Sequence, residues 1–286
     1  AVVRTGTEAR KTASGYDLTG LFVGSEGTLG LITELTLRLQ GQPEAISAGV
    51  CSFDTINQAV AAVIDTIQMG LPMARIEFID AATVAAVNQY SSAGLPELPH
   101  LLVEFHGSEA GVAEQSETFG LIVAEHDAHD FKWATQAEDR SALWKMRHTA
   151  YYAVLASHPG AGAMVTDICV PISKLADAVE QTSAEINQSS IAGPIMGHVG
   201  DGNFHAILMI DPEKPDDLKT AKDLSERMVT RALEMGGTAT GEHGIGVGKL
   251  DYMAREHGHG WTVMSSIKRA LDPQDIMNPG KLLRQN

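Results

Sequence analysis

The chain has 286 residues, of which 44% are hydrophobic and 20% are charged. This composition is typical of a globular protein with one large domain or two ordinary ones, and it excludes a disordered or fibrous chain. The formal net charge of −15 argues against a surface that follows nucleic-acid phosphates or anionic lipids, while a small anionic substrate in a locally positive pocket stays open. No apolar run approaches the roughly 20 residues that a membrane-spanning helix needs.

The first stretch with a pattern is 21–39, LFVGSEGTLGLITELTLRL. Its leucines alternate with the residues between them from position 29 to 39, which predicts two short strands around a Gly-rich turn. The segment 40–43, Gln-Gly-Gln-Pro, breaks the pattern and indicates a domain boundary at residue 42. No targeting segment is recognisable at the start of the sequence.

The rest of the chain predicts the strand and helix order of a ferredoxin-like unit twice, with helices over a mostly antiparallel sheet, and therefore an α+β fold. The first round has strands at 46–53, 74–79, 101–105 and 129–135, with helices at 56–68, capped by Asp54, and at 109–123. The second has strands at 164–170, 194–199, 204–210 and 238–240, with helices at 174–187 and 215–235; further helices are expected at 138–157 and 261–271.

Only two cysteines are present, Cys51 and Cys169, and both lie in apolar strand-like runs. Two cysteines predict no disulfide framework and favour a reducing compartment. Their surroundings are typical of buried, unreactive thiols.

Two histidines, His198 and His205, flank the turn-like tract of HVGDGNFH at 198–205. A hairpin with the loop Gly200–Asn203 would place the two histidines directly opposite each other, with Cβ atoms about 4.5–5.5 Å apart. At that separation both imidazoles can bind one metal ion. A partly exposed polar pair beside an ordinary turn is the alternative.

A third ligand is expected in TATGEHGIGVGK at 238–249, which carries Glu242 and His243 among four glycines. Glycines at that density let the backbone approach a ligand closely. Glu242 could supply an oxygen ligand and His243 a base, although a solvated turn stays open. The segment is not a Walker loop, because Leu250 follows Lys249 where a Ser or Thr is required.

Several segments together resemble the FAD-linked oxidases of the vanillyl-alcohol-oxidase type, and within them the D-2-hydroxyacid dehydrogenase branch, most closely the D-lactate dehydrogenases. The motifs that carry this resemblance are GSEGTLGLIT at 24–33, RHTAYYA at 147–153, TDICVPISKL at 166–175, GHVGDGNFH at 197–205, GEHGIGVGK at 241–249 and LDPQDIMNPGKLL at 271–283. The resemblance covers essentially the whole chain.

The resemblance implies that His198, His205 and Glu242 bind a divalent metal ion, for which the His/His/carboxylate set favours zinc. It also implies that His243 is the base that takes the substrate hydroxyl proton while hydride leaves for the flavin.

Arg147 would grip the substrate carboxylate, a role that suits its planar fork. Its helix position alone would suggest a surface arginine. Tyr151, one turn further on, would shape the pocket or simply pack.

For the cofactor, the resemblance places Asn278 near the isoalloxazine ring and a further group of residues along the FAD: Ser25, Glu26, Gly27, Gly30 and Ile32. Residues 1–42 would be the remnant of the FAD-binding domain, 43–265 the substrate-binding domain with the metal site, and 266–286 a C-terminal helix and tail that return to the flavin. The chain is then expected to be a C-terminal fragment that lacks the pyrophosphate-binding half and is inactive alone.

The implied activity is FAD-dependent oxidation of a D-2-hydroxy acid to the 2-oxo acid. In relatives of the 2-hydroxyglutarate type a lysine precedes the aspartate that matches Asp167, whereas here Val165 and Thr166 precede it. This difference favours D-lactate over a dicarboxylate.

The electron acceptor stays open among a quinone, a cytochrome and an electron-transfer flavoprotein, and so does a homodimer. The expected location is the cytoplasm of a bacterium, with the periphery of the inner membrane as an alternative, or the mitochondrion of a eukaryote. Two other functions remain open: a zinc-dependent hydrolase or deaminase, and a ferredoxin-like binding module without chemistry. Bound-flavin absorbance in the complete protein would separate the FAD-dependent dehydrogenase from the zinc enzyme. Loss of metal on purification, with no effect of His198→Ala, would support the binding module.

Overall fold

The computed structural model describes residues 1–284, apart from the side chain of Asp130. The chain divides into two compact units. Gly41–Gly241 form the sheet unit, and Ala1–Gln40 together with the residues from Glu242 onward form the terminal unit. Each is described by itself.

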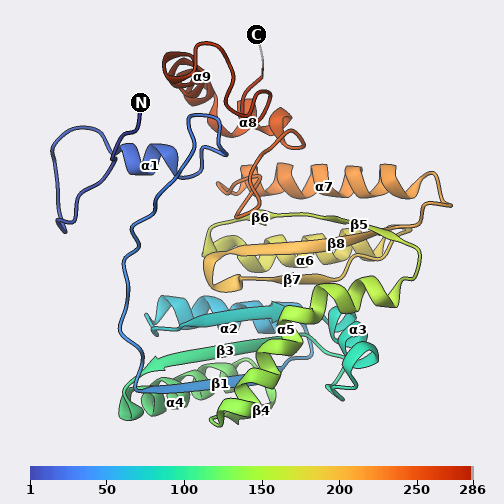
Figure 1. Cartoon of the computed structure of the whole chain (residues 1–286). Coiled ribbons are helices and arrows are strands. Elements are labelled where there is room, and N and C mark those ends of the chain that lie inside the picture. The colour runs from blue at the N-terminus through green and yellow to red at the C-terminus, as the bar shows by residue number, and fades with distance from the viewer. Residues whose placement is uncertain (285–286) are drawn as a thin grey trace. The chain divides into compact units, whose positions relative to one another are not determined.

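The sheet unit contains an antiparallel sheet with the strand order β4-β1-β3-β2-β7-β8-β5, and β6 also pairs with β8 (Figure 1). The strands are β1 Ala45–Ser52, β2 Arg75–Ile79, β3 His100–Gly107, β4 His129–Ala134, β5 Gly162–Val165, β6 Ile168–Cys169, β7 Ile195–Gly197 and β8 Asn203–Ile210.

Both halves of the sheet have the ferredoxin-like order, and they join where β2 pairs with β7. In the first half the order is β4-β1-β3-β2. In the second half β8 lies between β7 and the β5–β6 segment, and the fourth strand is reduced to one bridge from Thr238 to Cys169. The predicted α+β fold with an antiparallel sheet covered by helices is confirmed.

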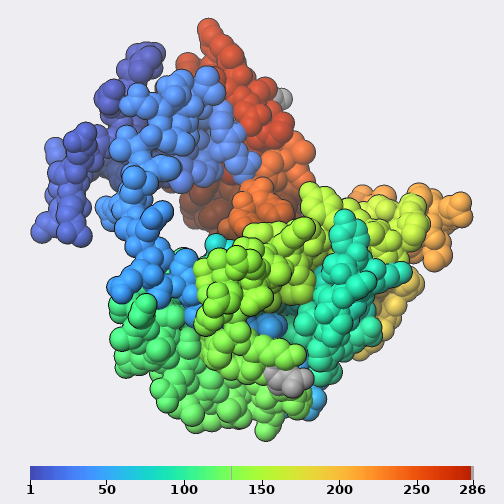
Figure 2. Space-filling view, turned by 60° about the horizontal axis from the view of Figure 1, so that its bottom comes forward, coloured from blue at the N-terminus to red at the C-terminus, as the bar shows by residue number. Residues whose placement is uncertain are grey.

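Helices cover both faces of the sheet. One layer consists of α2 Ile56–Gln68, α4 Glu109–Glu125, α6 Leu175–Asn187 and α7 Asp217–Glu234 (Figure 1). The opposite face is covered by α3 Ala81–Ser91 and α5 Ala137–Ser157, which pack side by side (Figure 2). Helix α3 is an element that the sequence analysis missed. Under it and α5 lies a cluster of buried apolar side chains that includes Ile79, Leu102, Val154, Met196 and Ile207.

The predicted cap of α2 is wrong by one residue. Thr55, not Asp54, is the N-cap, because Thr55 and Gln58 form a capping box. The Thr55 side chain accepts a hydrogen bond from the Gln58 backbone at 3.2 Å, and the Gln58 side chain accepts one from the Thr55 backbone at 3.0 Å. This reciprocal pair satisfies two backbone donors of the first turn.

The terminal unit contains the helices α1 Leu18–Phe22, α8 Met253–His257 and α9 His259–Leu271. The two strands predicted within 21–39 are wrong: Leu21 and Phe22 end α1, and 31–39 has no regular structure. An alternating pattern makes a strand only where a partner strand pairs with it. Within residues 1–284 no strand pairs with this segment, and its leucines are exposed.

Among residues 1–284, no helix combines the length and apolar character that crossing a membrane requires.

Candidate active site

The two histidines lie on the β7–β8 hairpin, as predicted, but the predicted register is wrong by two residues. Met196, not His198, is opposite His205. His198 instead accepts a hydrogen bond from the Asn203 backbone on its carbonyl oxygen, at 3.4 Å, and is the diagonal neighbour of His205. The two imidazole centroids are 6.1 Å apart with an interplanar angle of 85°.

The loop of the hairpin explains this register. Val199–Asp201 form a 3-10 turn, and Gly202 follows in the left-handed region at φ 78°. A Cβ at Gly202 would lie 2.1 Å from the carbonyl oxygen of Val170, so only glycine fits there. The chain therefore reverses over residues 199–202, and both histidines stay on one face of the sheet.

The hydrogen bonds of both imidazoles fix their tautomers. His205 Nδ1 donates to the carbonyl oxygen of Thr166 at 2.9 Å, and His198 Nδ1 donates to Glu77 Oε1 at 2.6 Å. Because a carbonyl oxygen can only accept, Nδ1 of His205 carries a proton, and in the neutral imidazole the lone pair is then on Nε2. Metal-binding histidines are usually oriented in this way, by a carbonyl or carboxylate on the other ring nitrogen.

A buried polar group surrounds His205. Asp167 accepts hydrogen bonds from Asn203 Nδ2 at 2.8 Å and from Thr240 Oγ1 at 2.5 Å. Its Oδ1 lies 3.8 Å from His205 Nδ1. Among the described residues, the buried Asn203 Oδ1 has no hydrogen-bond partner. A buried acceptor of this kind is uncommon in native proteins, and a cation or an added donor would satisfy it.

Glu242 and His243 are the first residues of the terminal unit. The residue before them, Gly241, packs on Asn203: a Cβ at Gly241 would lie 2.1 Å from Asn203 Nδ2. Since consecutive Cα atoms are about 3.8 Å apart, the covalent chain holds Glu242 one residue from this contact. His243 Nε2 lies 3.3 Å from Glu242 Oε1.

Arg147 is not a surface arginine. It lies on α5 with its side chain 12% exposed, and its Nε and Nη2 donate to Glu77 Oε2 at 3.1 and 2.9 Å. Its Nη1 contacts Met196 Sδ at 3.6 Å. Tyr151 packs against the apolar cluster under α3 and α5 and against the ring of Tyr152.

Glu77 is a site residue that the sequence analysis missed. It contacts both predicted residues, Arg147 and His198, although they are 70 and 121 residues away in the sequence. The only sequence signal is a carboxylate between apolar residues of the strand RIEFI at 75–79. Such a carboxylate must have a partner when it is buried.

The predicted flavin residues are in the terminal unit, where they join three of the motifs. The Glu26 carboxylate accepts hydrogen bonds from the backbone of Ile245 at 2.6 Å and of Gly246 at 2.8 Å. Asn278 Nδ2 donates to the carbonyl oxygen of Glu26 at 2.6 Å. Around this turn, Ser25 is buried and Ile32 is half exposed. Glu26 of the SEGTLG motif is therefore hydrogen-bonded to residues of the other two motifs, GEHGIG and MNPG.

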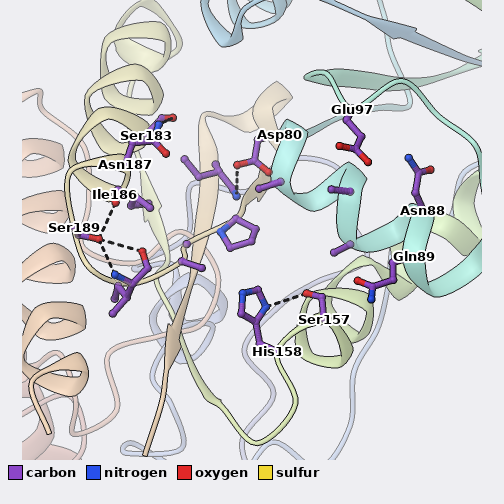
Figure 3. Close-up of a pocket in the computed structure, with 18 of the residues that line it drawn as sticks. Asp80, Asn88, Gln89, Glu97, Ser157, His158, Ser183, Ile186, Asn187 and Ser189 are labelled. Atoms are coloured by element: carbon purple, nitrogen blue, oxygen red, sulfur yellow. Dashed lines mark hydrogen bonds between the residues drawn. The ribbon is translucent and has the colours of Figure 1, made fainter. Parts of the chain in front are cut away.

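A separate hollow of about 790 Å³ opens in the sheet unit near the ends of α3, α5 and α6 (Figure 3). Burial raises the pKa of Asp80, which lines it, to about 6. His158 in the same wall shares a hydrogen bond with Ser157. None of the predicted site residues lines this hollow, and its lining includes no lysine or arginine. It is therefore a poor site for an anionic acid.

The fold is shared with solved structures of vanillyl-alcohol-oxidase-type FAD oxidases. The chain is similar to 4-ethylphenol oxidase from Gulosibacter chungangensis, with a TM-score of 0.72 and 16% identity over 94% of this chain and 59% of that one. The similarity to p-cresol methylhydroxylase has a TM-score of 0.71 and 15% identity over 94% of this chain and 58% of that one. At this identity the likeness concerns the fold alone.

The chain belongs to the family of FAD linked oxidases, C-terminal domain, whose model matches residues 42–282. It is 47% identical to a probable mitochondrial D-lactate dehydrogenase of Danio rerio, over 97% of this chain and 56% of that protein. It is 44% identical to a mitochondrial cytochrome D-lactate dehydrogenase of Arabidopsis thaliana, over 99% and 50%. Thus the chain spans about half the length of these curated relatives.

Proposed function

We propose that the protein to which this chain belongs oxidises a D-2-hydroxy acid, with D-lactate favoured, to the 2-oxo acid. FAD, when bound, would accept the hydride from the substrate carbon. The observation that carries the proposal is the placement of His198, His205 and Arg147 on one sheet face, with both imidazoles oriented through Nδ1. The 47% and 44% identity to D-lactate dehydrogenases supports it.

His198, His205 and Glu242 would hold a divalent metal ion, and two imidazoles with one carboxylate suit zinc. The fixed Nδ1 proton of His205 and the unsatisfied buried Asn203 Oδ1 fit such a site. When bound, the ion would polarise the hydroxyl and carboxylate oxygens of the acid and lower the pKa of the hydroxyl.

The remaining steps are assigned to side chains of this chain. Arg147 would bind the substrate carboxylate through its Nη1 side, because Glu77 takes Nε and Nη2. His243 would accept the hydroxyl proton on a ring nitrogen. Tyr151, one helical turn from Arg147, would bound the pocket.

FAD would lie along the Glu26 turn, with Asn278 near the ring and with Ser25, Gly27, Gly30 and Ile32 along the nucleotide. The positive φ values of Glu26 (52°) and Gly27 (71°) make a tight turn whose backbone can approach a cofactor closely. In functional terms we assign residues 1–42 to the FAD-binding part, 43–265 to the substrate-binding part and 266–286 to a tail that returns to the flavin.

The names of the relatives support a cytochrome as electron acceptor and a mitochondrial location if the source is a eukaryote. A quinone or an electron-transfer flavoprotein would serve the same chemistry, and in a bacterium the cytoplasm or the periphery of the inner membrane would be the location. A homodimer is also compatible with the proposal.

The direct test is anaerobic mixing of the full-length flavoprotein with D-lactate while the absorbance of the oxidised flavin is followed. We expect D-lactate to bleach the flavin and L-lactate, the matched control, to leave it oxidised. A flavin that D-lactate and other D-2-hydroxy acids fail to reduce would contradict the proposal.

A further inference from the structure

We propose that Glu77 is a positioning residue that orients the metal-binding His198 and the acid-binding Arg147 through one carboxylate. This inference rests on the proposed function, because it concerns the residues assigned there to the metal ion and to the substrate. It adds that metal binding by His198 and binding of the acid by Arg147 both depend on Glu77. One substitution at Glu77 should therefore impair both.

The geometry divides the two oxygens of Glu77 between the two partners. Oε1 accepts from His198 Nδ1 at 2.6 Å. Oε2 accepts from Arg147 Nε at 3.1 Å and from Nη2 at 2.9 Å. The Glu77 side chain is only 10% exposed, so solvent cannot readily replace either partner.

The fold brings these three side chains together from three elements. Phe78 pairs with Gly197 and Ile79 with Met196, so the same register continued by one residue places Glu77 opposite His198. Helix α5 crosses this face and supplies Arg147. A carboxylate buried in an apolar strand is unfavourable unless it is paired, and here the guanidinium and the imidazole compensate it together.

Each partner gains a defined orientation. An Nδ1–H bond to a carboxylate fixes the tautomer of His198 with its lone pair on Nε2 and makes that nitrogen a stronger metal ligand. For Arg147, Glu77 occupies the Nε–Nη2 edge, and Nη1, which contacts only the weak acceptor Met196 Sδ at 3.6 Å in the interactions described above, would bind a substrate carboxylate. The side chain is thus held before the acid arrives, which lowers the cost of ordering it on binding.

The neighbouring strand offers a matched control. Glu104 is also a buried carboxylate, with a side chain 7% exposed, and it accepts hydrogen bonds from Trp144 Nε1 at 2.5 Å and from His106 Nε2 at 2.8 Å. Its further ion pair is with Arg75 Nε at 3.6 Å. Glu104 contacts neither His198 nor Arg147 in these interactions.

The test compares Glu77→Gln with Glu104→Gln in the 286-residue chain, titrated with Zn²⁺ against a competing chelator. A glutamine can accept from only one of the two partners on its single oxygen. We expect Glu77→Gln to weaken Zn²⁺ binding about 10–100-fold, the range for lost partners of ligating histidines, and Glu104→Gln to leave it unchanged. Equal affinity in Glu77→Gln and the parent chain would overturn the inference.

Two further readouts separate this inference from the proposed function. If His198→Ala weakens Zn²⁺ binding and Glu77→Gln does not, the metal site stands and the role of Glu77 is wrong. If the parent chain does not bind Zn²⁺, the metal assignment itself fails. In the full-length enzyme, Glu77→Gln should raise KM for D-lactate more than Glu104→Gln does, and an unchanged KM would contradict the link to Arg147.

A measurement on the parent chain covers the case in which Glu77→Gln does not fold. Nitrogen-15 NMR of selectively labelled histidines reports the tautomer of each imidazole. We expect His198 with its proton on Nδ1, and a downfield proton signal from the bond to Glu77. A His198 protonated on Nε2 would overturn the inference without any variant.

Discussion

At the scale of single residues, the proposed metal site depends on two imidazoles whose orientation comes from hydrogen bonds rather than from direct opposition across the hairpin. His205 is buried and bonded to Thr166, whereas the His198 side chain is 42% exposed and bonded to Glu77. The ring of His205 is oriented by a backbone carbonyl oxygen, and the ring of His198 is oriented by a side-chain carboxylate. His198 should therefore be the more adjustable of the two.

Replacing His198 or His205 by alanine should abolish stoichiometric metal binding, because a three-ligand site that retains two ligands binds weakly. Elemental analysis of the purified variants checks this, with Glu104→Gln as a control that should keep its metal. Full occupancy in either histidine variant would refute the site.

At the level of secondary-structure elements, Lys268 of α9 forms hydrogen bonds that connect α9 to the C-terminal tail within the terminal unit. Its ammonium group donates to Asp272 Oδ2 at 2.5 Å, to the carbonyl oxygen of Thr28 at 2.8 Å and to that of Met277 at 2.7 Å. The hydrogen bond from Lys268 holds the pKa of Asp272 below its usual value. Asp272 also accepts from the backbone of Ile276 and Met277.

This pKa shift predicts a pH dependence of stability. Because the pKa of Asp272 is lowered in the folded state, its contribution is complete above the usual aspartate pKa of about 3.9 and is lost as the pH falls through the lowered value. The melting temperature of Asp272→Asn should lie below that of the parent chain at pH 7, and the gap should narrow at strongly acidic pH. Thermal unfolding of both proteins across this range measures it. A gap independent of pH would contradict the assignment.

Some secondary-structure elements could be predicted from the sequence and others could not. The helix at 56–68 was foreseen because its apolar residues repeat with the helical period, and Val60 and Val63 of that face are buried. The leucines of 31–39 repeat with the period of a strand, but no strand among residues 1–284 pairs with them. The prediction of a strand from this period alone was therefore wrong. Helix α3 was missed although Asp80, its N-cap, and the alanines after it are local signals.

The candidate site was less predictable for a physical reason. Residue types suited to metal and carboxylate binding were visible in the sequence, but their partners come from distant strands. Glu77 meets His198 only because β2 pairs with β7, and that pairing joins the two halves of the sheet. The hairpin register depends on Gly202, whose need to be glycine comes from the approach of Val170. Neither fact is encoded in local periodicity.

For the whole molecule, the chain spans about half the length of its curated relatives, and this bears on cofactor binding. We predict that the 286-residue chain folds but binds little or no FAD, because it spans only 56% and 50% of the length of these relatives. Quenching of flavin fluorescence on titration checks this, with the full-length protein as the positive control. A stoichiometric complex of micromolar affinity or tighter would show that the cofactor site is assigned wrongly.

We propose that this site acts on a small D-2-hydroxy monocarboxylate. In this proposal Arg147 would supply one guanidinium for the single carboxylate of the acid. Val165 and Thr166 precede Asp167, where the resemblance places a lysine in relatives that act on a dicarboxylate. The most direct measurement is the steady-state kcat/KM of the full-length enzyme for D-lactate and for D-2-hydroxyglutarate under the same conditions. We expect a higher kcat/KM for D-lactate, and a higher value for D-2-hydroxyglutarate would contradict the proposed specificity.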